Sequence, residues 1–313
     1  MGELRKDYIL DRWVIIASER AKRPQQFRRE DVQEEVKSCD FCPGSENATP
    51  PEVYRVEKNG TWQVRAFPNK FAAVKQEGDP VIHTDNVFYT YASNYGKHLV
   101  LTETPEHTKQ LWDLDVEEIV LVLRGYIEMI YLMHDDPSIK YVTIFKNHKK
   151  EAGTSIVHSH SQIIGYNKVP EEVAREVEAT KSYNFCPYCD VIQREKGSAR
   201  RCFENENFVA FCPYASRFPF EVWILPKQHL THLEDIKDLH GLAAMMKTVL
   251  SKLKELNAPF NYVLHHSPTP ADKLHFHIEI MPRLTTWAGF EMNGTVINPQ
   301  PPEEAARFYR GEE

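Results

Sequence analysis

The chain has 313 residues, of which 42% are apolar and 27% are charged, and 38 Lys and Arg face 45 Asp and Glu. The resulting net charge of −7 argues against a broad basic face of the kind that binds nucleic acid or anionic membranes. No apolar run is long enough for a membrane span, and the N-terminus does not resemble a signal peptide. We therefore expect a cytoplasmic globular protein with two domains or two fused repeats.

The two halves of the chain carry the same features in the same order, which indicates an internal repeat. Each half has a Cys-x-x-Cys pair, two strand-like runs, an isolated His, a long amphipathic segment, a further strand and a His-x-His motif. In the first half these lie at 39–42, 62–67, 98–103, His107, a helix from Asp115, 141–145 and 158–162. In the second half they lie at 186–189, 208–212, 220–225, His229, 235–256, 262–266 and 275–279. We predict an α+β fold of two repeats, residues 1–168 and 169–313, each an antiparallel sheet with a long helix packed on it.

The helices are predicted from capping residues and apolar spacing. Asp115 followed by Glu118 forms an Asp-led capping box. Apolar residues then recur at helical spacing, at Ile119, Val122, Leu123, Tyr126, Ile130 and Met133. An acidic stretch after Pro170 favours a solvated linking helix between the repeats, and a turn at 299–302 precedes a short C-terminal helix.

Each His-x-His motif is predicted to lie on a strand. Because successive side chains of a strand face opposite sides, His158, His160 and Gln162 project together. In the second half His275, His277 and Glu279 share one face, and Leu274, Phe276, Ile278 and Ile280 form the opposite, core-facing side. A lone pair of this kind is usually an exposed strand face. Two such pairs, each following a Cys pair and an isolated His, favour a chemical role.

Cysteine and histidine together predict two metal sites, most simply zinc, which prefers tetrahedral sets of thiolate and imidazole. The first set is Cys39, Cys42, His107 and His158, and the second is Cys186, Cys189, His229 and His275. Fully ligated sites are structural, so the ions should orient the His-x-His strands without activating water. A redox role for either Cys pair is the alternative. Glu176, His232 and His265 are rival ligands at the second site.

The sequence resembles the galactose-1-phosphate uridylyltransferases and the related ADP-glucose phosphorylases of the histidine-triad superfamily. The resemblance runs from Arg20-Ala21-Lys22-Arg23-Pro24 through the segment 153–162 (GTSIVHSHSQ) to Ala288-Gly289-Phe290-Glu291. That family usually has Pro between its two histidines and Gly before its Gln. Ser159 and Ser161 stand at these places here, and we expect little consequence. The resemblance implies histidine-triad-like repeats and a homodimer with a site completed across subunits.

The resemblance also implies roles for individual residues. His160 is the covalent nucleophile, and Gln162 hydrogen-bonds the phosphoryl oxygen. A neutral imidazole that attacks the α-phosphorus divides one hard substitution into two easier ones. Arg20 and Arg23 match a basic pair that contacts the nucleotide, Asn69 a contact to base or ribose, and Asn147 and Ser155 phosphate contacts. At the segment that holds the sugar, the uridylyltransferases typically have Gly-Tyr-Glu followed by a Gln. Here Phe290 and Glu291 stand at the Tyr and Glu positions, and the chain leads instead into the tail 296–299 (VINP).

The second copy is expected to be structural, because Glu279 stands where the first copy has Gln162, and a carboxylate repels an incoming phosphate. The leading function is ping-pong transfer of UMP from UDP-glucose to galactose 1-phosphate, with UDP-galactose and a hexose 1-phosphate as the other nucleotide and sugar ligands. An ADP-glucose phosphorylase using the same nucleophile is the alternative, favoured by the 296–299 tail and the matched Cys sites. Gln162 makes a simple hydrolase less favoured. A non-catalytic, zinc-stabilised nucleotide sensor is a third possibility from a different class.

Overall fold

The computed structural model describes residues 2–19 and 38–312. They form two compact units: unit 1 comprises 2–19, 147–155 and 175–312, and unit 2 comprises 38–146 and 156–174. Both contain helices and antiparallel strands, which confirms the predicted α+β class. Within the described ranges, no helix combines the length and the apolar character that crossing a bilayer demands.

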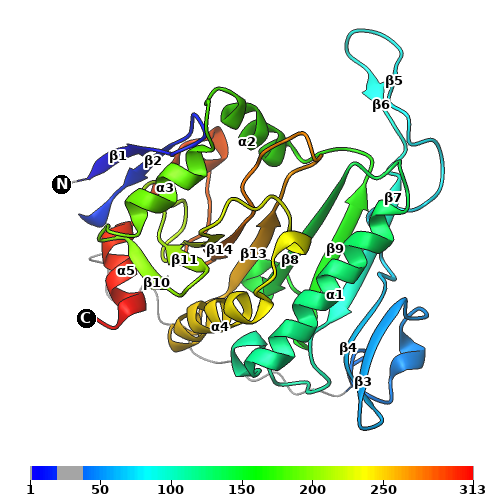
Figure 1. Cartoon of the computed structure of the whole chain (residues 1–313). Helices are drawn as coiled ribbons and strands as arrows, with labels where there is room; N and C mark the ends of the chain where they lie inside the picture. The colour runs from blue at the N-terminus through cyan, green and yellow to red at the C-terminus, as the bar shows by residue number, and fades with distance from the viewer. Residues whose placement is uncertain (1, 20–37, 313) are drawn as a thin grey trace. The chain divides into compact units, whose positions relative to one another are not determined.

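Unit 2 is built on five antiparallel strands in the order β3-β4-β7-β9-β8. The strands span Tyr54–Lys58 (β3), Thr61–Pro68 (β4), Gly96–Thr102 (β7), Tyr141–His148 (β8, whose last two residues belong to unit 1) and His160–Tyr166 (β9). Helix α1, Val116–His134, packs along this sheet against β4 and β9 (Figure 1). Strands β4 and β7 match the predicted runs 62–67 and 98–103 closely.

Helix α1 begins as its sequence predicts. The Asp115 carboxylate accepts a hydrogen bond of 2.8 Å from the Glu118 backbone N–H, and Glu118 accepts one of 2.7 Å from the Asp115 N–H. This capping box satisfies two donors that a helix start otherwise leaves without partners. The apolar stripe of the helix is buried, including all six residues predicted for it.

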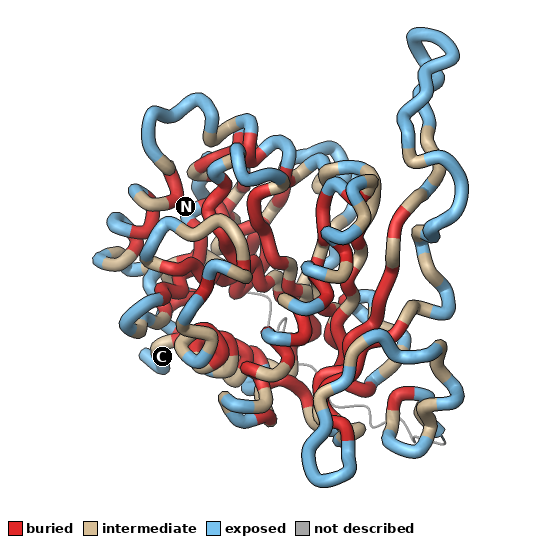
Figure 2. The backbone as a smooth tube through the Cα atoms, turned by 45° about the vertical axis from the view of Figure 1, so that its right-hand side comes forward, coloured by how far each residue is buried: buried red, intermediate tan, exposed pale blue. Residues whose placement is uncertain are grey.

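A two-stranded hairpin extends from unit 2 between β4 and β7. Its strands are β5, His83–Thr84, and β6, Thr90–Tyr91. Figure 2 shows the hairpin as an exposed projection, and Val87 and Phe88 at its tip are 88% and 85% exposed. The hairpin therefore adds nothing to the core of the unit.

Unit 1 repeats the topology of unit 2. Its main strands follow the order β10-β11-β12-β14-β13, all antiparallel. They span Arg201–Glu204 (β10), Phe208–Phe211 (β11), Val222–Pro226 (β12), Phe260–His265 (β13) and His277–Pro282 (β14). As in unit 2, the third strand leads to a long helix, here α4, Leu239–Glu255, which packs on β10 and β11. The shared strand order and helix position confirm the predicted repeat, while the boundary at residue 168 stays a prediction.

Further elements complete unit 1. Strands β1 (Glu3–Lys6), β2 (Trp13–Ile16) and β15 (Val296–Asn298) form a small sheet. Helices α3 (Pro187–Glu195) and α5 (Pro302–Arg310) belong to the same unit, and α5 is the predicted C-terminal helix. Short 3-10 helices lie at Glu46–Ala48 (η2), Leu111–Asp113 (η3), Lys150–Ala152 (η4), Leu233–Asp235 (η5) and Glu291–Asn293 (η6).

Three expectations from the sequence need correction. Helix α4 begins at Leu239 and not near Asp235, because the Asp238 carboxylate accepts a bond from the Gly241 N–H and ends the preceding turn. Strands β9 and β14 begin at the second His of each motif. The linking helix α2, Glu171–Lys181, is not solvated all round, because Glu176 and Val177 on it are buried.

Candidate active site and metal centres

The first Cys and His set comes together in unit 2. The turn from Cys39 to Cys42 is closed by a 3.2 Å bond from the Cys42 N–H to the Cys39 carbonyl. The Cys42 sulfur lies 3.4 Å from His107 Nδ1 and 3.5 Å from His158 Nδ1, and the Cys39 sulfur lies 3.7 Å from His158 Nδ1. Four possible ligand atoms therefore converge on one point.

The ring of His158 is oriented for ligation by its second nitrogen. Its Nε2 donates a 2.7 Å hydrogen bond to the Thr104 carbonyl, which can only accept, so Nδ1 carries the lone pair that faces the sulfurs. Burial lowers the pKa of His158 to about 4, which keeps the ring neutral at pH 7. A neutral imidazole with one nitrogen held by a carbonyl is the usual form of a metal-bound histidine.

The second set comes together in unit 1 with the same geometry. His275 Nε2 donates to the Pro226 carbonyl at 2.9 Å, and its Nδ1 lies 3.5 Å from the Cys189 sulfur and 3.7 Å from the Cys186 sulfur. Burial lowers the pKa of His275 to about 3. His229 Nδ1 lies 3.3 Å from His275 Nδ1. Cys186 sits at the N-cap of α3, so the start of a helix presents this Cys pair, where a turn presents the first.

The spacing of the donor atoms fits a tetrahedral ion in both sets. With metal bonds of about 2.3 Å to sulfur and about 2.05 Å to nitrogen, a tetrahedron places sulfur about 3.5 Å from nitrogen and two nitrogens about 3.3 Å apart. The observed separations of sulfur from nitrogen are 3.4 to 3.7 Å, and the separation of the two nitrogens is 3.3 Å. The residues therefore fit a divalent ion with thiolate and imidazole ligands.

The rival ligands of the second set lie elsewhere in unit 1. His265 Nδ1 is 2.9 Å from Glu176, and together with His277 and Glu279 these two form a third, fully buried group that could hold a metal. His232 Nδ1 lies 2.9 Å from the Thr231 hydroxyl. None of the three is among the donors that surround Cys186 and Cys189.

His160 is held as a neutral imidazole on β9. Its Nδ1 donates to the His158 carbonyl at 2.8 Å, which leaves the lone pair on Nε2. Burial, and then the positive charge of Lys146, lower the pKa of His160 below its ordinary value of 6.5. Phe41 packs edge-on against the ring, with centroids 5.3 Å apart. The candidate metal ligand His158 and the candidate nucleophile His160 are therefore joined by one hydrogen bond.

Gln162 is oriented by a histidine that the sequence did not single out. His98 Nδ1 accepts a 3.1 Å bond from the Ala73 N–H, so His98 Nε2 carries the proton and donates to the Gln162 carbonyl oxygen at 2.9 Å. This bond fixes which end of the amide is which, and leaves the NH2 group of Gln162 to donate elsewhere. The Asn69 amide nitrogen lies 3.1 Å from the same ring nitrogen.

The other predicted contact residues are placed as follows. Asn147 lies in unit 1 and accepts a 2.8 Å bond from Asn261, and Ser155 is exposed in the same unit. Phe290 is 51% exposed next to η6, and Glu291 accepts a bond from the Ala288 N–H at 2.9 Å. Arg20 and Arg23 lie outside the described residues. The roles of all these residues toward substrate remain predictions.

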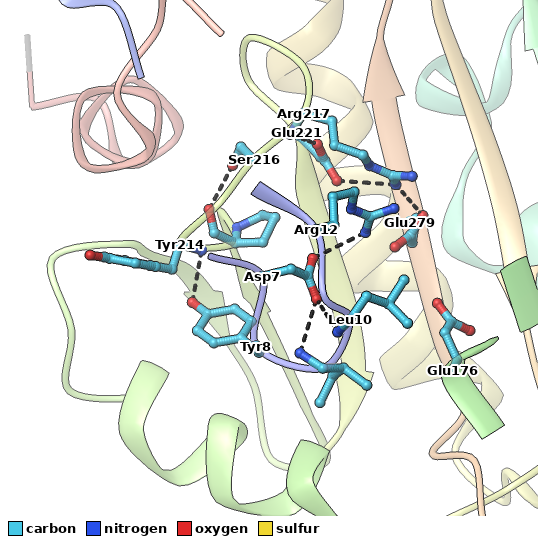
Figure 3. Close-up of polar contacts among 12 residues, drawn as sticks. Asp7, Tyr8, Leu10, Arg12, Glu176, Tyr214, Ser216, Arg217, Glu221 and Glu279 are labelled. Atoms are coloured by element: carbon cyan, nitrogen blue, oxygen red, sulfur yellow. Dashed lines mark hydrogen bonds and ion pairs between the residues drawn. The ribbon is translucent and has the colours of Figure 1, made fainter. Parts of the chain in front are cut away.

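The strand of unit 1 that is equivalent to β9 is β14, where the motif residues are buried and the carboxylate is paired with an arginine. His277 and Glu279 are 0% and 2% exposed. Figure 3 shows the Arg217 guanidinium between Glu221 and Glu279, with bonds to both carboxylates. Glu279 thus already has a cationic partner at the position that corresponds to Gln162, which agrees with a structural role for this copy.

Sequence reasoning missed a second buried group in unit 2. Glu103, Lys146, Ser159 and Ser161 are each 1% exposed. The serines were expected to have little consequence, yet both hydroxyls donate to Glu103. Glu103 at the end of one predicted strand run and Lys146 directly after another were the available signal, because these residues are seldom buried unless they are paired.

Comparison with known proteins identifies relatives of this chain. A family model for the N-terminal domain of galactose-1-phosphate uridyl transferase matches residues 2–170, and a model for a domain of unknown function (DUF4921) matches residues 113–306. ADP-glucose phosphorylase of Arabidopsis thaliana is 34% identical over 98% of this chain and 92% of its own length. Galactose-1-phosphate uridylyltransferase of Thermotoga maritima is 28% identical over 99% of this chain and 98% of its own.

The fold comparison gives the same result. A crystal structure of an ADP-glucose phosphorylase from Arabidopsis thaliana with bound ADP-glucose has a TM-score of 0.86 and 34% identity, covering 99% of this chain and 98% of that chain. The family model spans more than half of the sequence, and the Arabidopsis relative matches almost all of it. The chain therefore belongs to the galactose-1-phosphate uridylyltransferase family.

Proposed function

We propose that the protein transfers a nucleoside monophosphate from a sugar nucleotide to a second phosphate through a covalent intermediate on His160. The observation that carries the proposal is the state of the His160 ring. Its Nδ1 donates to the His158 carbonyl, its Nε2 therefore carries the lone pair, and burial keeps the ring neutral. A neutral, oriented imidazole is the form that attacks phosphorus.

The reaction then proceeds in two balanced substitutions. His160 Nε2 forms a bond to the α-phosphorus, the bond from that phosphorus to the bridging oxygen breaks, and the sugar 1-phosphate leaves with the electron pair. A phosphate oxygen of the acceptor next attacks the same phosphorus, and the bond to nitrogen breaks. The imidazole regains its lone pair, and neither step needs a proton from an acid, because both leaving groups are stable.

Gln162 supports transfer by donating to the α-phosphoryl oxygen. His98 holds the carbonyl end of the amide, so its NH2 end is the one available to the phosphate. An amide stabilises developing charge on oxygen without offering a group that removes a proton from water. This choice of side chain favours transfer over hydrolysis.

We propose two structural zinc ions, one in each Cys and His set. Each set supplies four protein ligands, which leaves no open position for water or substrate. When bound, the ion gives a rigid cross-link and no acid–base chemistry. In unit 2 this cross-link would fix the position of His158. The backbone carbonyl of His158 in turn accepts the hydrogen bond that orients the His160 ring.

ADP-glucose with inorganic phosphate as acceptor is the first substrate pair we propose. The 34% identical relative is an ADP-glucose phosphorylase, and the structure with the 0.86 TM-score contains ADP-glucose. Transfer of UMP from UDP-glucose to galactose 1-phosphate is the second, supported by the family model and by the Thermotoga relative.

Isotope exchange tests the proposal. Labelled glucose 1-phosphate should enter ADP-glucose or UDP-glucose with no second acceptor present, because the first substitution is reversible. His160→Asn should abolish this exchange, and the control His83→Asn, at an exposed histidine of the β5–β6 hairpin, should preserve it. Binding of the nucleotide without exchange would support a sensor and contradict the enzyme. Comparing the transfer rate for ADP-glucose with inorganic phosphate against that for UDP-glucose with galactose 1-phosphate identifies the preferred donor and acceptor.

A further inference from the structure

We propose that the buried pair of Lys146 and Glu103 is the positioning group of the nucleophile strand, acting with the hydroxyls of Ser159 and Ser161. The inference rests on the proposed function, because it assigns a task toward His160. All of the residues concerned belong to unit 2. Ser159 and Ser161 flank His160 in the sequence, so in an extended segment their side chains lie on the face opposite to the His160 side chain. On that face they contact Glu103 and Lys146.

The ammonium group of Lys146, on β8, bonds to Glu103, which follows β7, and to the segment at the start of β9. It donates to Glu103 at 2.6 Å, to the Ser159 hydroxyl at 2.9 Å and to the His160 backbone carbonyl at 3.2 Å. The side chains of Lys146 and Glu103 are 1% and 0% exposed. A charge removed from water to this degree is tolerated only when it is paired and hydrogen-bonded, so the three bonds fix the ammonium group.

The carboxylate of Glu103 accepts further hydrogen bonds from the same segment. Both serine hydroxyls donate to it, and Tyr126 on α1 lies within 2.5 Å of the Ser161 hydroxyl and 3.3 Å of Glu103. The Glu103 backbone N–H donates to the Ser159 carbonyl at 3.1 Å. The pair therefore binds side chains on both sides of His160 in the sequence.

Three consecutive backbone carbonyls of the nucleophile segment, at residues 158 to 160, each accept a hydrogen bond. The His158 carbonyl accepts from the His160 ring, the Ser159 carbonyl from the Glu103 N–H, and the His160 carbonyl from Lys146. Thr104, next to Glu103, accepts from the metal-facing His158. A hydrophobic pair could fill the same volume but would donate nothing to the His160 carbonyl, so the charges serve orientation more than stability.

The test is the double variant Lys146→Met with Glu103→Gln, which removes both charges at similar volume. We expect it to fold, with a thermal midpoint close to that of the wild type, because no unpaired charge stays buried. The KM for the sugar nucleotide should change little. The kcat of glucose 1-phosphate exchange should fall about 10- to 100-fold, the loss expected when a reacting group is misplaced by a fraction of an ångström to an ångström.

The matched control neutralises a partly buried ion pair of unit 1, Arg200→Met with Glu195→Gln, whose atoms lie 2.7 Å apart. It should lower the thermal midpoint, because Arg200 also pairs with Glu303, which keeps its charge and loses this partner, and it should leave kcat near the wild-type value. A folded Lys146 and Glu103 double variant with wild-type kcat overturns the inference. If that variant does not fold, Ser159→Ala with Ser161→Ala decides: reduced kcat at constant KM supports the inference, and wild-type kcat overturns it. Absence of exchange in the wild type refutes the proposed function instead.

Discussion

At the scale of single residues, the site depends on which ring nitrogens carry protons. Three histidines are assigned by a partner that can play only one role: the carbonyls of Thr104 and His158 accept from His158 and His160, and the Ala73 N–H donates to His98. Under the proposed function, these three histidines are a metal ligand, the nucleophile and an orienting donor. Each assignment follows from backbone groups that a substitution of a side chain does not remove.

The orienting role of His98 leads to a first prediction. His98→Phe removes the donor to Gln162 and frees its amide to turn, so kcat should fall, but less than in Gln162→Ala. Loss of a donor to a charged transition state costs about 10²- to 10³-fold in kcat, which sets the scale for Gln162→Ala. Steady-state kinetics of the two variants checks the order, and a larger loss in His98→Phe with intact fold would contradict it.

A second prediction concerns stability in acid. Burial alone would raise the pKa of Glu103, but the Lys146 charge and the hydrogen bonds from Lys146, Ser159 and Ser161 outweigh it and hold the pKa below 4.5. A depressed carboxyl pKa stabilises the fold above pH 4.5, and this contribution is lost as the pH falls through the folded-state value. Denaturant unfolding between pH 7 and 3 should therefore show a steeper loss in the wild type than in Glu103→Gln. Parallel pH curves would be inconsistent with this account.

At the scale of elements, strands present the chemistry and helices cover the sheets. The strand β7 carries His98 and leads directly to Glu103, and β9 carries His160 and Gln162, so two neighbouring strands hold most of the site. The position of α1 on this sheet is set by a capping box and a buried stripe.

The cap of α1 gives a third prediction. Asp115→Ala should lower the free energy of unfolding by about 1 kcal/mol, because the Glu118 N–H loses its acceptor. The control Glu128→Ala, at an exposed position of the same helix, should change it by no more than about 0.5 kcal/mol. Urea denaturation measures both, and equal effects would show that the cap does not define the helix start.

Much of the arrangement of strands and helices could be predicted from the sequence. The strand positions, α1 and the two Cys and His sets follow from local patterns that occur twice in the chain. The start of α4 was missed because Asp238 competes as a cap with the acidic residues before it. The buried partners of β9 were missed because Lys146 and Glu103, 43 positions apart, pair only through the sheet register, while such residues usually lie at the surface.

At the scale of the whole molecule, two repeats of one topology differ in the residues that follow the second His of each motif. Both keep a Cys and His set at the start of their last strand, but only unit 2 continues with an amide, Gln162. In unit 1 the corresponding Glu279 is paired with Arg217. The domain boundary at residue 168, the homodimer and the cytoplasmic location remain predictions from the sequence.

The two metal sets give a fourth prediction. Metal analysis should find about two zinc ions per chain in the wild type and one in each of Cys42→Ser and Cys189→Ser, because each set has four protein ligands. Both variants should melt at lower temperature. Cys42→Ser should lose more exchange activity, since its set holds His158 beside the nucleophile. Equal activity losses would contradict the division of roles between the units.

The covalent intermediate is tested most directly by mass spectrometry of the enzyme after mixing with ADP-glucose or UDP-glucose and quenching in base, where a phosphoramidate survives. We predict a peptide containing His160 that carries one nucleoside monophosphate, labile in acid and absent from His160→Asn. An unmodified wild-type enzyme that still turns over, or an adduct that persists in His160→Asn, would contradict the account.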